Sequence, residues 1–79
     1  MDILEDFQRI TQIPGIMGGK PCVKGTRITV ARIVAQIGVG QSIESLLEDY
    51  PHLTREDVLE ALRFAAWLAD MREVELVMA

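Results

Sequence analysis

The chain has 79 residues, and its eight lysines and arginines against twelve aspartates and glutamates give a formal net charge of −4. A domain of this size buries only about 60–65% of the surface that its unfolded chain exposes, so its core is marginal. The single cysteine excludes an internal disulfide, and Cys22 with the lone His52 is too little for a zinc site, which needs about four ligands. We therefore expect the domain to gain stability by association.

The sequence has no apolar run of about 18 residues and no signal-peptide pattern, because its first residues are acidic. We expect a soluble, cytoplasmic protein with no membrane partner. The net charge argues mildly against a protein that coats nucleic acid, but the distribution of charge matters more. Residues 7–43 carry five basic groups and no acidic one, whereas residues 44–79 carry nine acidic groups and three arginines. An acidic protein with one basic face is the expected result.

The N-terminal part of the chain predicts a short helix over residues 2–8, followed by two extended segments. These segments, Arg9–Ile13 and Cys22–Ile28, can pair as a hairpin, and Pro14 and Pro21 confine them to edge positions. Between and within them lies a glycine-rich run with several basic residues, from Gly18 to Val30. Its glycines permit backbone angles that other residues avoid, so we expect a shaped loop and not a generic linker.

Three helices follow, each with a recognisable start. Thr29 and Ser42 are good N-caps, and Thr54 with Asp57 is typical of a capping box with a shorter acid than usual. Apolar residues recur at helical spacing in the first two helices (Val30, Ile33, Val34, Ile37; then Ile43, Leu46, Leu47, Tyr50). Glycines 38 and 40 end the first helix, and Pro51 stops the second.

The third helix begins near residue 54, and nothing breaks it before residue 79. We expect its core face to comprise Val58, Leu62, Ala65 and Ala69. A second apolar stripe follows steps of three and four residues along the same helix: Phe64, Trp67, Met71, Val74 and Met78. The alternative for Phe64 and Trp67 is that they belong to the core, covered by the N-terminal segment. The stripe predicts an interface for a homodimer or for a different protein.

These elements predict a mainly α fold: a three-helix bundle with a short N-terminal β segment and an extended C-terminal helix. We expect residues 1–28 to form an N-terminal arm with the glycine- and lysine-rich β/loop segment. Residues 29–79 then form the bundle and its interface helix within one domain. The connector around Pro51 can turn the second and third helices steeply, as in a helix-turn-helix unit, although many plain bundles share this layout.

The order of several motifs resembles the domain of unknown function family 433 over roughly residues 10–67. The motifs are Pro14-Gly15-Ile16, Gly19-Lys20-Pro21, Gly25-Thr26-Arg27-Ile28, Asp49-Tyr50-Pro51, Leu53-Thr54, Asp57-Val58 and Ala61-Leu62. This resemblance implies a homeodomain-like three-helix fold preceded by a short β segment. It also implies an antitoxin of a toxin–antitoxin system, whose partner is a PIN-like nuclease toxin. Our hypothesis is an antitoxin-like regulator that neutralises such a nuclease and binds its own promoter DNA.

The candidate nucleic-acid-binding residues are Lys20, Lys24, Arg27, Arg32 and Arg55. Arg27 can grip phosphate through its planar fork, or it can clamp the glycine loop through a carboxylate or a carbonyl. Lys20 and Lys24 suit phosphate contact, but solvated surface lysines are common. The hydroxyl of Thr26 is expected to bond the local backbone.

In a helix-turn-helix docking, the start of the third helix enters the major groove, which would present Thr54, Arg55, Glu56, Glu60 and Arg63. The acidic members oppose phosphates, so a solvated face with a Glu60–Arg63 pair is the competing interpretation. Cys22 is expected to be a small packed hydrophobe. The sequence contains no catalytic triad, metal cluster or phosphate loop, and we expect neither catalysis nor a cofactor. The alternative function is a homodimeric interaction module without a nucleic-acid role.

Overall fold

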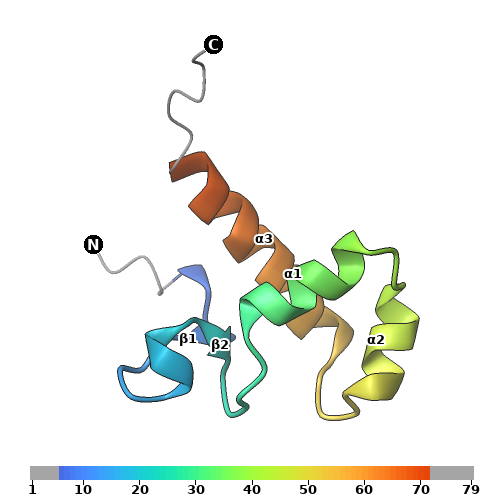
Figure 1. The fold of residues 1–79 in the computed structure, drawn as a ribbon, viewed down its shortest axis with the longest axis horizontal. Coiled ribbons are helices and arrows are strands. Elements are labelled where there is room, and N and C mark those ends of the chain that lie inside the picture. Colours follow the sequence, from blue (N-terminus) through green and yellow to red (C-terminus); the bar gives the residue numbers. More distant parts are fainter. Residues whose placement is uncertain (1–5, 72–79) are drawn as a thin grey trace.

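The computed structural model describes residues 6–71, and Figure 1 shows their arrangement. In chain order the elements are β1 (Ile10–Thr11), the 3-10 turn η2 (Met17–Gly19), β2 (Cys22–Val23), α1 (Val30–Gly38), α2 (Ile43–Asp49) and α3 (Arg55–Met71). The small sheet lies on one side of the helices, and α1 packs against the long α3. The predicted fold class, three helices with a short β segment before them, is confirmed.

The three helix starts follow from their capping side chains. Thr29 Oγ1 accepts a hydrogen bond from the Arg32 backbone N–H at 3.0 Å, and Ser42 Oγ accepts one from Ser45 at 3.1 Å. At the start of α3, Thr54 Oγ1 accepts from the Asp57 N–H at 3.1 Å, and Asp57 Oδ2 accepts from the Thr54 N–H at 2.9 Å. The predicted capping box is therefore confirmed, because each residue satisfies a donor of the other.

The sheet is antiparallel, with Ile10 opposite Val23 and Thr11 opposite Cys22. An isolated bridge between Cys22 and Thr29 continues this pairing toward α1. The predicted hairpin is present, with strands shorter than the segments predicted for them. The expected helix over residues 2–8 lies largely outside the described residues. None of the described helices is long and apolar enough to cross a membrane.

The core lies where the sheet and all three helices meet. Its most deeply buried large side chains are Ile33, Leu46, Val58 and Phe64. On α3 the innermost residues include Val58, Ala61 and Phe64, whereas Ala69 is exposed. Of the predicted core face, Val58 is buried and Leu62 and Ala65 pack against the core, but Ala69 is not part of it, and the sequence-based face left out Ala61 and Phe64. The cause is the N-terminal segment, because Phe7 packs edge-on against Phe64 with ring centroids 5.1 Å apart.

Candidate functional site

The glycine-rich loop is held in shape by its own backbone and by Thr26. The Thr26 hydroxyl donates to the Val23 carbonyl at 2.8 Å and accepts from the Ile28 N–H at 3.0 Å. The expected local role of Thr26 is thus confirmed. Gly25 has φ +81°, although a Cβ there would meet no atom within 4 Å, so the backbone angle and not the space favours glycine. This tight turn presents Lys24 and Arg27 on either side of it.

Arg27 is exposed and lies where three surface hollows meet. These hollows have volumes of about 390, 560 and 280 Å³. Within residues 6–71, no carboxylate or carbonyl pairs with the Arg27 guanidinium, so the loop-clamp interpretation finds no partner there. A guanidinium without an internal partner is available for an external anion.

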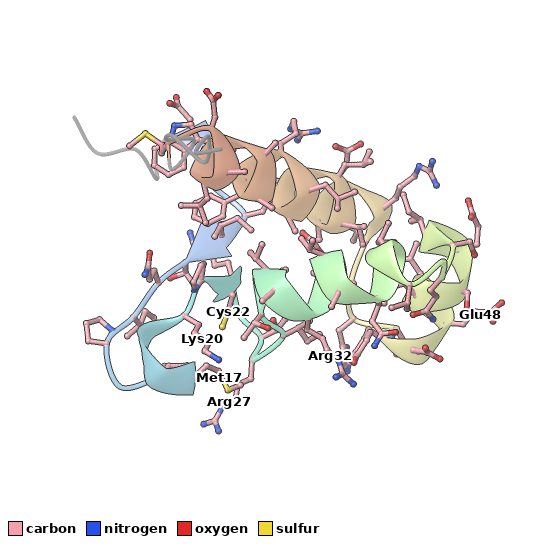
Figure 2. All side chains as sticks on the ribbon, turned by 45° about the horizontal axis from the view of Figure 1, so that its top comes forward. Met17, Lys20, Cys22, Arg27, Arg32 and Glu48 are labelled. Carbon is pink, nitrogen blue, oxygen red and sulfur yellow. The ribbon has the colours of Figure 1, made fainter. Side chains whose placement is uncertain are left out.

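The other basic residues of this region extend the charge around Arg27. We use the term basic face for Lys20, Lys24, Arg27 and Arg32, all of which are exposed. Figure 2 shows Lys20, Arg27 and Arg32 toward the same side, with Glu48 at the far end of the molecule. The residues that line the three hollows include no aspartate or glutamate. A positive surface of this kind attracts anions.

Arg32 is oriented by Tyr50. Its Nε donates to the Tyr50 hydroxyl at 3.2 Å, and this hydrogen bond raises the pKa of Arg32 from its ordinary value. The guanidinium of Arg32 is therefore held at the hydroxyl of Tyr50.

Arg55, the fifth predicted nucleic-acid contact, forms an ion pair within the protein. Its Nη1 lies 3.1 Å from Glu44 Oε2 and joins the start of α3 to α2. The pKa of Glu44 is lowered, first because its carboxylate accepts a hydrogen bond from the Glu44 backbone and second because it accepts one from Arg55. Arg55 lines none of the three hollows and does not belong to the basic face.

The start of α3 is partly covered by residues 6–11, which are the described part of the N-terminal arm before the glycine-rich segment. The Arg9 backbone N–H donates to Glu60 Oε2 at 2.6 Å, and Arg9 Nη1 lies 3.1 Å from Asp57 Oδ1. Glu60 is consequently only 8% exposed, and it also lies 3.9 Å from Arg63 Nη2. The proposed presentation of Glu60 to a DNA groove was therefore wrong. Sequence reasoning gave Arg9 no role, because its contacts are about 50 positions away in the chain.

The apolar stripe of α3 divides along its length. Phe64 is buried at 2% exposure, so it belongs to the core and not to an exposed seam, and half-buried Trp67 packs 5.9 Å from it between ring centroids. The interface assignment of Phe64 is corrected accordingly. Met71 is 65% exposed, and Leu68 beside the stripe is 36% exposed. Val74 and Met78 lie outside the described residues.

An apolar groove of about 420 Å³ runs between α1 and α3. Its lining residues are mostly small or aliphatic: Pro21, Val30, Ala31, Val34, Ala35, Ala65 and Leu68, with Lys20 at the rim. Leu68 connects this groove to the exposed part of the stripe. The surface around Leu68 and Met71 is the main apolar exposure that α3 offers within the described chain.

The remaining chemistry-bearing residues have structural or solvent-facing positions. Cys22 is buried and its Sγ lies 3.4 Å from the Lys20 carbonyl oxygen, as expected of a packed thiol. His52 is exposed at the rim of the hollow beside Lys24. Residues 6–71 contain no group of three His, Cys, Asp or Glu side chains that could hold a metal ion.

The chain is similar to a protein family, to a curated protein and to a solved structure. Residues 10–65 match the family model described as "Protein of unknown function (DUF433)". An uncharacterised protein, y4eO of Sinorhizobium fredii, is 39% identical over 64 residues. That alignment spans 81% of this chain but only 29% of the relative's length. The crystal structure of a DUF433 member from Anabaena variabilis superposes with a TM-score of 0.76 at 29% identity, covering 90% of this chain and 79% of that one.

Proposed function

Since this chain belongs to the DUF433 family, whose description carries no activity, we propose its function from its surface: it is an antitoxin-like regulator. In this proposal the basic face binds nucleic-acid phosphates, with the protein's own promoter DNA as the target. The second half of α3 binds a protein partner, for which the family resemblance suggests a PIN-like nuclease toxin. The observation that carries the nucleic-acid part is Arg27, which is exposed, has no partner among residues 6–71 and lies among hollows whose described lining contains no carboxylate.

Phosphate contact explains why the charges are arranged as they are. The chain is acidic overall, at −4, so an unspecific attraction of the whole molecule to nucleic acid is weak. Local attraction by the basic face requires that the carboxylates of α2 and α3 be kept away from it. Asp57 and Glu60 are paired with Arg9, and Glu44 is paired with Arg55, which limits their repulsion of a bound phosphate.

The protein-partner part is supported by exposed apolar surface on α3. Met71 is 65% exposed and Leu68 continues into the groove between α1 and α3. Adjacent exposed apolar side chains with a groove beside them are typical of an interface. The negative charge of the C-terminal half complements the basic RNA-binding cleft that a nuclease carries.

The groove also favours the second candidate function, a homodimeric interaction module with no nucleic-acid role. Small side chains at 31, 35 and 65 let a helix approach closely. In that case Met71 and Leu68 meet their counterparts on a second copy, and the basic residues only keep the protein soluble.

A binding assay on duplex DNA separates these functions. We expect the protein, alone or co-expressed with its protein partner, to retard its promoter fragment, with affinity that falls steeply as salt rises. Arg27→Gln with Lys24→Gln should weaken binding about tenfold or more, whereas Arg55→Gln, outside the basic face, serves as the matched control. Binding that ignores both salt and the double substitution would contradict the nucleic-acid role. A co-purified nuclease without a DNA shift would keep the antitoxin role alone.

A further inference from the structure

One of the three hollows around Arg27 has walls that differ from a plain phosphate site. Its volume is about 280 Å³, and its lining combines two arginines with two apolar residues, one threonine and one tyrosine: Met17, Arg27, Ile28, Thr29, Arg32 and Tyr50. We call this the Met17 hollow. We propose that it binds a single unstacked nucleotide, with the base against Met17, Ile28 and Tyr50 and the phosphate on Arg27 and Arg32. The proposal deepens the nucleic-acid role and rests on it.

The size of the hollow suits one nucleotide unit and not a larger ligand. Sites for drug-sized molecules occupy roughly 300–1,000 Å³. The Met17 hollow lies just below this range and is partly open to solvent. A flat base can enter it while the sugar and phosphate remain at the rim, where the guanidinium groups are.

Tyr50 and Arg32 form the organised part of the hollow. The hydroxyl of Tyr50 accepts from Arg32 Nε at 3.2 Å. The Tyr50 backbone is fixed as well, because its N–H donates to the Leu46 carbonyl at 3.0 Å and its carbonyl accepts from the Leu53 N–H at 2.9 Å. With Nε engaged, the terminal nitrogens of Arg32 can still bind phosphate oxygens. The Tyr50 hydroxyl therefore fixes the Arg32 guanidinium next to the position that the base would occupy against the ring.

Met17 supplies an unusual wall. Among residues 6–71 it is the one non-glycine with positive φ, at 51°, and its side chain is 43% exposed. A left-handed backbone is unfavourable for this residue type, and such strain concentrates at binding sites. Here it accompanies an apolar side chain that lies at the surface beside Arg27. Figure 2 shows Met17 and Arg27 close together at the same edge of the molecule.

This combination favours an unstacked base over an intact duplex. In a duplex the bases are paired and stacked, so only phosphates and base edges reach a protein surface. A base freed from its stack offers a flat apolar face, which aromatic side chains bind with little sequence preference, while basic residues hold the backbone. The wall chemistry of the Met17 hollow matches that second case.

The test measures fluorescence anisotropy of the whole chain with a labelled oligothymidylate and with a labelled duplex of equal length, at one salt concentration. We expect tighter binding of the single strand. Tyr50→Phe and Tyr50→Leu both remove the hydroxyl that holds Arg32, so the two variants should bind the duplex equally. Only Tyr50→Leu also removes the ring, and it should weaken single-strand binding about tenfold more than Tyr50→Phe does, the loss typical of one stacking contact. Met17→Asn tolerates the left-handed backbone and should weaken only the single-strand complex.

A second arm identifies the source of the nucleotide. Thymidine monophosphate is titrated into the protein, and the Met17 methyl and Tyr50 ring resonances are followed. If the resonances shift saturably at millimolar or lower nucleotide concentration, and the single strand binds no more tightly than the duplex, a free nucleotide is the ligand. Tighter binding of the strand supports an unpaired base within a nucleic acid.

The outcomes separate this inference from the proposed function. Equal binding of strand and duplex, with no difference between Tyr50→Leu and Tyr50→Phe and no effect of Met17→Asn, overturns the inference and leaves the phosphate-binding role intact. Absence of binding to both oligonucleotides overturns the nucleic-acid role. If the mononucleotide also causes no change in the Met17 and Tyr50 resonances, the inference is overturned as well. Lys20→Gln with Lys24→Gln lies outside the Met17 hollow and should weaken both oligonucleotide complexes alike.

Discussion

Glu60 is the residue whose environment departs most from what its type suggests. A glutamate on the second turn of a helix is ordinarily solvated, yet Glu60 is 8% exposed. The short hydrogen bond from the Arg9 N–H and the nearby Arg63 guanidinium compensate its charge. No feature of the sequence indicates this, because helical spacing pairs Glu60 with Arg63 but says nothing of a backbone donor from the distant arm.

We predict that Glu60→Leu lowers the free energy of unfolding by about 1–3 kcal/mol, because it leaves the Arg9 N–H without an acceptor. Glu60→Gln keeps an acceptor oxygen and should cost less. Glu56→Gln changes an exposed carboxylate of the same helix and should stay within about 0.5 kcal/mol of the parent. Urea denaturation followed by circular dichroism measures all three. Equal stability of the leucine variant and the parent would contradict the role assigned to Glu60.

At the scale of elements, the helices were the most predictable part of the fold. Their caps at Thr29, Ser42 and Thr54 are local signals, and each makes the expected hydrogen bond. The direction in which α3 faces was not predictable in the same way. The spacing of apolar residues on α3 gives two candidate stripes and does not say which one is buried. The docking of Phe7 on Phe64 decides it.

The candidate site was partly predictable for a related reason. The four residues of the basic face, Arg27 and the three around it, are near one another in sequence and share one loop and one helix start. Arg55 was assigned to the same function from the helix-turn-helix layout, but its contact with Glu44 depends on how α2 packs against α3. The Met17 hollow depends on the return of Tyr50 to the loop, which a single sequence does not reveal.

We predict that Thr29→Ala costs about 1 kcal/mol of stability, because it removes the acceptor for the Arg32 N–H at the start of α1. Thr29→Ser retains the hydroxyl and is the matched control. Thermal unfolding should show the alanine variant melting several degrees below the serine variant. If the two melt together, the capping bond contributes nothing to stability.

For the molecule as a whole, Arg27 and Arg32 of the basic face lie apart from Met71 at the end of α3, whereas Lys20 also lines the groove that Leu68 lines. The basic residues lie on the loop and on the first turn of α1, whereas Met71 ends the described part of α3. This separation allows one surface to hold nucleic acid while the other holds a protein, which is what the proposed function requires.

We predict that Met71→Lys reduces association of the chain with itself or with its partner, because a charge replaces a side chain that is 65% exposed at the end of α3. Val39→Lys is the control, since Val39 is 80% exposed and lies at the end of α1. Sedimentation velocity should show a smaller species for the Met71 variant and an unchanged one for the Val39 variant. A wild-type chain that remains monomeric and captures no partner at any concentration would contradict the interface.

The attachment of the arm to α3 has a consequence for the order of folding. The Arg9 contacts with Asp57 and Glu60 join positions 48 and 51 residues apart, whereas each helix and its cap form from neighbours. Closing so long a loop costs entropy before any contact offsets it. The helices can therefore assemble early and the strands attach last. Native-state amide exchange should then find Lys24, which donates to the Arg9 carbonyl, opening before Ile33 in the middle of α1.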